Sequence, residues 1–537
     1  MTGARLALAA LLCVAAASPL AAQSTSVVPL DDPAYLWLDR LEVLGLVDSA
    51  VMGQRPYSYR EMQRLAHAAR GRSATRTDDA DYRLTTALLD RLDARITGQP
   101  AATPIADALF AATGTDAVRR PLPGAGTSSP PEAEANPLIP RRLGPQPVRG
   151  QTAALEPLQR IEPTSWLAFQ ARERLEVRHA TAGSRSSWDT ALLVASGRAR
   201  WRNVALGVGR QQVGWGSGGE GGLIIAADAP ALDQISLSSD APFLLPSVLR
   251  RLGPVAATLL VADMGPSSVR SESELLAYKV SARPSAALEL GFSFEDHYGG
   301  VGGRSSSFLD RLVDFLPVVD VFRKHNYTDT TRTLDVDSDK VLGTDVRWRI
   351  DRLGGVIVAG EWLLDDFDVG RLASVFNYGA SQRLVVTVPR VGSPAWSVQV
   401  GAAHLGPLTY THFTIKPGMT TRGRLLGSEL GPDSKAFSAG VTWMASPDLR
   451  LSVDGMASIH SDASYSDGYD AEGNWVVRKV SARPDELREQ AVGSLTFAPT
   501  ADASLTLRAG AARIRNAMFT GGRRHDWVAD VGFRVRP

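Results

Sequence analysis

The chain has 537 residues, with 58 Lys and Arg against 57 Asp and Glu and a formal net charge of +1 at pH 7. Nucleic-acid-binding proteins usually have an excess of clustered basic residues, and this nearly balanced chain has none, so no nucleic-acid partner is expected. The single cysteine, Cys13, falls in the leader described next, so no disulfide and no cysteine-based metal site are expected in the mature protein.

Residues 1–22 predict a cleaved secretory signal peptide. Arg5 supplies a positive start, Leu6–Ala17 is a short apolar run, and small residues lead to a cleavage site after Ala22. The apolar run is too short to span a bilayer stably. The rest of the chain contains no long apolar stretch, so we expect an exported protein without a transmembrane helix.

Residues 23–96 predict a small helical bundle. Asp32, followed by a proline, is typical of a helix start, and the first helix covers about 33–45. Ser58 stands three residues before a glutamate, which is the spacing of a capping box and starts the second helix. A third helix begins near Asp81 and carries leucines at helical spacing.

Residues 97–164 are rich in Pro, Gly and Ala and predict a poorly ordered linker. From 165 to 537 the hydrophobic pattern changes to period two. At the C-terminus, for example, Trp527 and Phe533 lie on one face of a predicted strand, and Asp530 on the other. Such strands fit either a soluble sheet or a membrane barrel with a wet lumen.

The lengths of the connections favour the membrane barrel. Tight turns alternate with long connections. The long connections cover roughly 298–339, 366–373, 406–435, 460–486 and 516–524. Bacterial outer-membrane barrels have short periplasmic turns and long outer loops. The predicted fold is therefore mainly β: a large antiparallel transmembrane β-barrel over 165–537, preceded by a small periplasmic helical bundle.

Counting strands gives about 16, or 18 if a further pair lies in 216–240 or 298–339; an even number returns the C-terminus to the periplasm. We expect the protein in the outer membrane, in contact with its lipid.

Several blocks in this order resemble the Wzi-type capsule assembly family. They are Val28–Tyr35 with Leu38–Leu41, Gly53–Tyr57, Gly209–Gly218, Asp339–Arg349 with Glu361 and Asp365, Tyr410, Arg422–Gly427 and Gly431–Ser434. The resemblance implies an outer-membrane lectin that attaches capsular polysaccharide or exopolysaccharide to the cell surface, with polysaccharide-export machinery as a further partner. It also implies that the protein is not an enzyme. No cofactor is expected. The alternative function is a porin or glycan-transport channel.

Sugar recognition uses flat aromatic faces and planar polar groups, and the predicted outer loops contain both. The candidate glycan-binding residues are Tyr298, Arg304, Arg323, Tyr327, Tyr465, Tyr469 and Trp475. Aromatic residues at loop bases also form the interfacial girdle of any barrel, which is the competing interpretation of each.

Three other patterns have simpler explanations. Asp335, Asp337 and Asp339 have calcium-ligand spacing, but a lysine and a valine replace the required glycine and glutamate, which favours a solvated acidic loop. Gly214–Gly222 lacks the lysine of a phosphate loop and predicts a bend around Trp215. Arginines on the polar strand faces indicate a lumen held together by ion pairs or, less favoured, a basic surface for an anionic polymer. They are Arg172, Arg174, Arg178, Arg198, Arg200, Arg202, Arg347 and Arg349.

Overall fold

The computed structural model describes most of the chain after residue 24. The residues described are 25–75, 81–97, 102–122, 133–140, 143, 146–181, 186–217, 222–266, 272–300, 338–365, 379–411, 418–463, 465–469, 471, 475–480 and 483–537. The predicted signal peptide lies outside them.

Three helices follow each other where the sequence predicts them: α2 (Pro33–Val43), α3 (Tyr59–Ser73) and α4 (Tyr82–Ile96). Asp32 caps α2 by accepting a hydrogen bond from the Ala34 amide at 2.9 Å, and Ser58 caps α3 by accepting one from the Glu61 amide at 3.1 Å. Their apolar faces share one core with the preceding segment. No helix in the described part of the chain is long and apolar enough to cross a bilayer.

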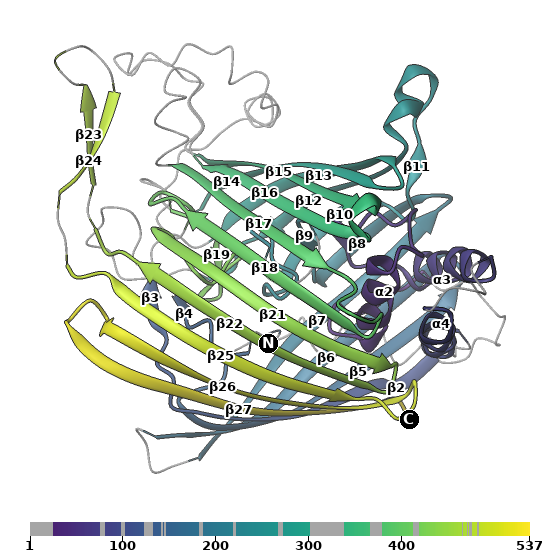
Figure 1. Cartoon of the computed structure of the whole chain (residues 1–537), viewed down its shortest axis with the longest axis horizontal. Helices are drawn as coiled ribbons and strands as arrows, with labels where there is room; N and C mark the ends of the chain where they lie inside the picture. Colours follow the sequence, from purple (N-terminus) through teal and green to yellow (C-terminus); the bar gives the residue numbers. More distant parts are fainter. Residues whose placement is uncertain are drawn as a thin grey trace.

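The rest of the molecule is a closed antiparallel barrel of 18 long strands within the described residues (Figure 1). The strands are β2 (Ala102–Thr115), β5 (Gly150–Thr164), β6 (Leu167–Ala180), β7 (Ser186–Trp201), β8 (Val204–Gln211), β10 (Leu232–Ser239), β12 (Pro254–Asp263), β13 (Ser273–Ser285), β14 (Leu288–Gly299), β15 (Ser338–Ile350), β16 (Val356–Asp365), β17 (Ala380–Val388), β18 (Trp396–Leu405), β21 (Ser434–Ser446), β22 (Leu449–His460), β25 (Glu486–Phe497), β26 (Ala503–Ala517) and β27 (Gly522–Val535). Each long strand pairs with the next along the chain, and β2 pairs with β27 to close the ring.

The prediction of a linker over 97–164 is wrong for most of that stretch. β2 and β5 are barrel strands, so the barrel begins at Ala102 rather than near 165. Their alternation is interrupted by proline, which is tolerated in a sheet at bulges; Pro104 lies in the register shift between Thr103 and Asp107. Farther along β2 the ring of Phe110 is exposed on the outer face, 6.3 Å from that of Phe533.

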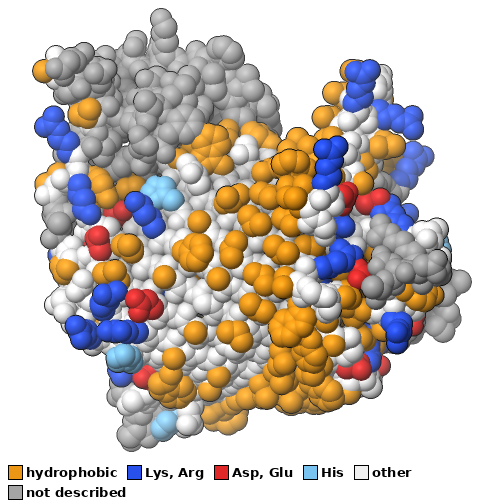
Figure 2. All heavy atoms as spheres, viewed as in Figure 1, with side chains coloured by type: hydrophobic (Ala, Val, Ile, Leu, Met, Phe, Trp, Pro, Cys, Tyr) orange, Lys and Arg blue, Asp and Glu red, His pale blue; other side chains and the backbone are white. Residues whose placement is uncertain are grey.

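The barrel carries apolar side chains outward and polar side chains inward. On β27, Trp527 and Phe533 are 48% and 43% exposed, while Asp530 and Arg534 are buried. Figure 2 shows hydrophobic side chains spread over the barrel wall. A closed sheet with this polarity satisfies its backbone internally and matches a lipid exterior, as the period-two pattern predicts.

Ion pairs line the inner face of the wall, which confirms the favoured interpretation of the arginines. Arg174 contacts Glu156 at 2.6 Å, and Lys279 contacts Asp345 at 2.6 Å. Of the eight arginines singled out from the sequence, seven pair with a carboxylate and Arg202 stacks on Trp201. The positive charges of the inward arginines and lysine are therefore balanced by carboxylates, and the lumen is not uniformly basic.

The two ends of the barrel differ. The helices lie at the end with the tight turns, which include the 3-10 turn η2 (Asp351–Leu353), and contact those turns directly (Figure 1). The Trp37 indole donates to the Pro447 carbonyl at 3.3 Å, and Arg91 donates to the Pro499 carbonyl at 3.1 Å. The long connections leave the opposite end, as the sequence predicts.

Candidate functional site

Three of the candidate glycan-binding residues lie on one hairpin beyond the end of the barrel opposite the helices (Figure 1). The hairpin is formed by β23 (Tyr465–Tyr469) and β24 (Trp475–Lys479), and its register places Tyr469 opposite Trp475. Residues at directly paired positions are close neighbours in a sheet. The structure therefore brings together two aromatic residues that lie six positions apart in the chain.

The base of this hairpin is attached to the residues that border β21 and β22. The Tyr465 hydroxyl donates to the Asp433 carboxylate at 2.7 Å, and Lys479 donates to the Ser461 hydroxyl at 3.0 Å. The Ser461 amide also donates to the Asp433 carbonyl at 2.9 Å. Tyr465 is thus a half-buried support of the hairpin as well as a candidate contact residue.

The other four candidates do not join this hairpin. Tyr298 is near the end of β14, opposite Glu274, and is only 5% exposed, so it is part of the wall rather than a loop surface. Arg304, Arg323 and Tyr327 lie outside the described residues, as do Asp335 and Asp337 of the acidic pattern. Asp339 is buried on β15, and no cluster of metal-ligating side chains occurs among the described residues.

The lumen contains segments that fold inward from the long connections. The segment after β8 forms β9 (Gly214–Trp215), and the one after β18 forms β19 (Thr420–Thr421) and β20 (Arg424–Leu425). A further pair, β3 (Arg120–Leu122) and β4 (Ala133–Ala135), lies between β2 and β5. Their apolar side chains pack with inward residues of the wall into one buried cluster, which includes Leu223, Ile224, Tyr410, Leu426, Leu260 and Leu363.

Short polar contacts fix these inward segments. The Tyr410 hydroxyl donates to the Leu223 carbonyl at 2.5 Å and accepts from the Ser428 amide at 3.0 Å. The buried Glu361 carboxylate of β16 accepts from the Leu223 amide at 2.6 Å and from the Ser217 hydroxyl at 2.9 Å. The sequence blocks around residues 215, 361, 410 and 425 therefore meet in the lumen, and the bend predicted around Trp215 is confirmed.

The segment before the barrel also enters the lumen. β1 (Gln54–Arg55) pairs with β9, with Gln54 opposite Trp215. The Glu289 carboxylate of β14 accepts from the amides of Met52 and Gly53 at 2.9 and 2.7 Å. The sequence did not predict this contact between β1 and β9, because a strand of two residues is too short to show an alternation of apolar and polar side chains.

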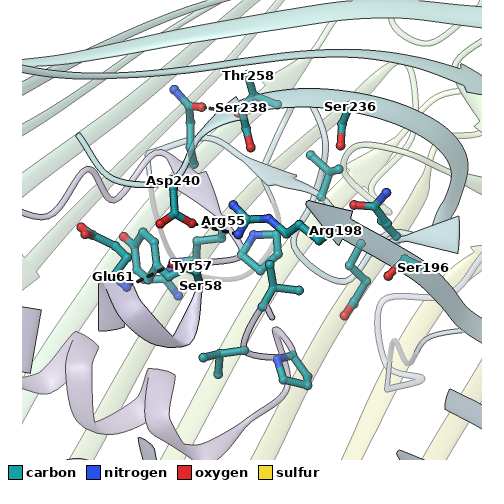
Figure 3. Close-up of a pocket in the computed structure, with 18 of the residues that line it drawn as sticks. Arg55, Tyr57, Ser58, Glu61, Ser196, Arg198, Ser236, Ser238, Asp240 and Thr258 are labelled. Carbon is teal, nitrogen blue, oxygen red and sulfur yellow. Dashed lines mark hydrogen bonds and ion pairs between the residues drawn. The ribbon is translucent and has the colours of Figure 1, made fainter. Parts of the chain in front are cut away.

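A cavity of about 120 Å³ remains between this segment and the wall formed by β6, β7, β8, β10 and β12 (Figure 3). The wall contributes amides and hydroxyls, including Gln170, Ser196, Gln234, Ser236, Ser238 and Thr258. Arg198 of β7 pairs with Asp240, the residue after β10, at 2.8 Å across this lining. This lining suits water or the hydroxyl groups of a small ligand.

Glu61, at the start of α3, also lines the cavity. Burial raises the pKa of its carboxyl, and the hydrogen bond from Arg64 partly offsets that rise. The Arg64 guanidinium donates to this carboxylate at 2.7 Å. The pair keeps the first turn of α3 fixed beside the cavity.

Comparisons with known proteins agree with this architecture. The family model described as capsule assembly protein Wzi matches residues 164–526. Wzi of Escherichia coli, described as an outer membrane protein involved in group 1 capsule assembly and a carbohydrate binding β-barrel, is similar in structure with a TM-score of 0.66. That match has 16% sequence identity and covers 95% of this chain and 99% of the other.

Pseudomonas aeruginosa OccD3 matches with a TM-score of 0.43 and 11% identity, over 82% of this chain and 94% of that one. Pseudomonas aeruginosa OprD matches with a TM-score of 0.42 and 9% identity, over 81% of this chain and 97% of that one. No curated protein sequence matches the chain. The Wzi model covers well over half of the chain, and the barrel found here is the fold of the Escherichia coli protein. The protein is thus an outer-membrane β-barrel that belongs to the Wzi capsule assembly family.

Proposed function

We propose that this protein is a non-catalytic lectin that binds capsular polysaccharide or exopolysaccharide and attaches it to the cell surface. The observation that carries the proposal is family membership together with a whole-chain fold like that of the carbohydrate-binding Wzi barrel of Escherichia coli. The packed lumen supports binding over conduction, because the cluster around Ile224 and Tyr410 connects inward segments to the wall.

In this proposal the polymer binds at the end of the barrel with the long connections. The β23–β24 hairpin has Tyr469 and Trp475 at directly paired positions. Arg304, Arg323 and Tyr327 stay candidates in the stretch between β14 and β15 that lies outside the described residues. Tyr298 is buried, so its role there is to support the rim rather than to contact sugar. The opposite end, with the helices, faces the periplasm and is the surface available to polysaccharide-export machinery.

Binding of polysaccharide extracted from the same cells to the purified full-length barrel tests the proposal. The double variant Tyr469→Ala/Trp475→Ala should weaken binding by about tenfold or more, since truncating a central aromatic anchor costs ~2 kcal/mol. The matched control is Trp201→Ala, because Trp201 is 71% exposed at the opposite end. It should bind like the wild type.

Absence of binding by the wild-type protein would refute the lectin proposal. Unchanged binding by the double variant, with a folded barrel confirmed by heat-dependent gel mobility, would refute this hairpin as the site.

A further inference from the structure

A second exposed feature lies at the opposite end of the barrel. Between β10 and β12, residues 240–254 extend past the neighbouring turns as a hairpin, which we call the rim hairpin. It contains β11 (Phe243–Leu244) and the 3-10 turn η1 (Ser247–Leu252), in which no residue is buried. Figure 1 shows it standing away from the barrel wall on the side of the helices.

The rim hairpin is unusually apolar for an exposed element. Val248 is 68% exposed, Leu244 52% and Leu249 49%, and Phe243 and Leu252 are exposed as well. A contiguous apolar surface of this kind marks a binding surface for a protein or a membrane. Its side chains are coloured as hydrophobic in the upper-right projection of Figure 2, beside basic ones.

The base of the hairpin is hydrogen-bonded to the tight turn that follows the exposed Trp201. The Asp240 amide donates to the Asn203 carbonyl at 2.9 Å, and the Asn203 side chain donates to the Ala241 carbonyl at 2.8 Å. Asn203 belongs to the tight turn after Trp201, which is 71% exposed. Exposed tryptophans in this position mark the headgroup level of a bilayer.

The apolar surface of the hairpin also continues the lipid-facing surface of the wall. On β10, which leads into the hairpin, Ile235 and Leu237 are 58% and 47% exposed. On the neighbouring β8, Leu206 and Val208 are exposed on the same outer face. Lipid therefore reaches the base of the hairpin from the membrane side.

Arg250 and Arg251 of the hairpin form no ion pair with any described residue, and residues 241–262 contain no acidic side chain. Three other arginines at this end of the barrel are paired with a carboxylate: Arg91 with Asp448, Arg349 with Asp351 and Arg390 with Asp81. The two guanidinium groups, which have no carboxylate partner among the described residues, suit phosphate, which they bind through several donors at once.

The hairpin has a fixed direction. Gly253, with φ +70°, has its Cα so close to the Arg283 carbonyl of β13 that a Cβ would overlap that oxygen. The Gly253 amide donates to the Arg250 carbonyl at 3.1 Å, which closes η1. A fixed apolar element with adjacent arginines has the properties of an interfacial membrane anchor.

We propose that the rim hairpin inserts its apolar side chains into the phospholipid leaflet at the periplasmic face of the outer membrane, where Arg250 and Arg251 bind the phosphates of anionic headgroups. The leaflet assignment rests on the orientation in the proposed function; the insertion itself does not depend on glycan binding. The hairpin thereby adds a lateral anchor on one side of the barrel.

Site-specific labelling tests the insertion in full-length protein reconstituted in phospholipid vesicles. The only cysteine of the chain is Cys13 in the predicted signal peptide, so Val248→Cys introduces a single label site in mature protein. A fluorophore at 248 should be quenched by nitroxide lipids with a shallow label. The matched control is Ala74→Cys, at an exposed position after α3, which should respond only to a water-soluble quencher.

The arginines are tested by the headgroup that carries the quencher. Anionic phospholipid should quench the label at 248 more than zwitterionic phospholipid, by about fivefold for each arginine in contact. Arg250→Gln/Arg251→Gln in the Val248→Cys background should abolish this preference while leaving gel mobility and polysaccharide binding unchanged.

A label at 248 that is as accessible to water as the one at 74 would overturn the proposal. Equal quenching by both headgroups in the wild-type hairpin would overturn the role of the arginines. Crosslinking of position 248 in cells to a protein rather than to lipid would also contradict it, and would assign the hairpin to a protein partner.

Discussion

Tyr410 and Gly427 show how closely the inward segments are packed at the scale of single residues. Tyr410 adopts φ +65°, an unfavourable region for a residue with a side chain, and its hydroxyl bridges Leu223 and Ser428. A Cβ on Gly427 would overlap both that hydroxyl and the Leu223 carbonyl. Position 427 therefore has to be glycine for three chain segments to meet.

Gly427→Ala should loosen this junction, because overpacking a closed site costs ~1–3 kcal/mol. Hydrogen exchange at the amides of 222–226 should become faster, with little change in the barrel strands. The matched control is Gly522→Ala on β27, where a Cβ would meet only the Thr520 hydroxyl oxygen, at 3.8 Å. Equal exchange in Gly427→Ala and the wild type would contradict the packing described here.

At the scale of elements, the helical segment is attached to the barrel by buried ion pairs. Asp32, which is 3% exposed, contacts Arg95 at 2.9 Å, and Arg95 also pairs with Asp107 of β2. Burial alone would raise the pKa of the Asp32 carboxyl, but the charges of Arg95 and Arg534 outweigh it and lower that pKa. Deprotonated Asp32 therefore stabilises the docked segment.

The sign of this shift gives a pH dependence. A lowered carboxyl pKa contributes stability that is present above the unfolded value of about 3.9 and is lost as pH falls through the folded-state pKa. Protease protection of α2–α4 should hold at neutral pH and decline below about pH 4. Asp32→Asn should weaken docking at neutral pH by ~1–3 kcal/mol, because it removes one of the two carboxylates that pair with the buried Arg95 and leaves Asp107 as the other.

The control for this change is Asp90→Asn. Asp90 pairs with Arg70 on the surface and is 63% exposed, so its loss should cost no more than ~1 kcal/mol. Equal protection of the Asp32→Asn and Asp90→Asn variants at pH 7 would contradict the role given to Asp32.

Local sequence signals predicted the elements that have strong periods or caps. Ser58 with Glu61 located the start of α3, and the alternation through Trp527, Asp530 and Phe533 located β27 and its faces. The sequence did not predict β2 as a strand, because proline and alanine interrupt its alternation of apolar and polar residues. The strands that stabilise it also give no local signal: β27 is far away in the sequence, and β5 has an equally weak alternation.

The candidate site was predictable only in part. The aromatic spacing of Tyr469 and Trp475 is visible in the sequence, but their pairing depends on the register of a hairpin within a long connection. Tyr298 looked equivalent and instead lies in the wall. The meeting of β1 with β9 depends on two chain segments about 160 residues apart, which no local pattern encodes.

At the scale of the whole molecule, the lumen is occupied from both sides. The segment before the barrel enters from the end with the helices, and the segments after β8 and β18 enter from the opposite end. Purified protein in a planar bilayer should therefore give no steady large conductance. An open, ohmic current comparable to that of a general porin would favour the channel function instead.

The most direct test of the central claim is deletion of the gene in the native, polysaccharide-producing cell, with separate measurement of cell-associated and released polymer. The account predicts that polymer is still made and released while the cell-associated fraction falls, and that wild-type protein restores it but Tyr469→Ala/Trp475→Ala does not. An unchanged amount of polymer on the surface of the deletion strain would contradict it.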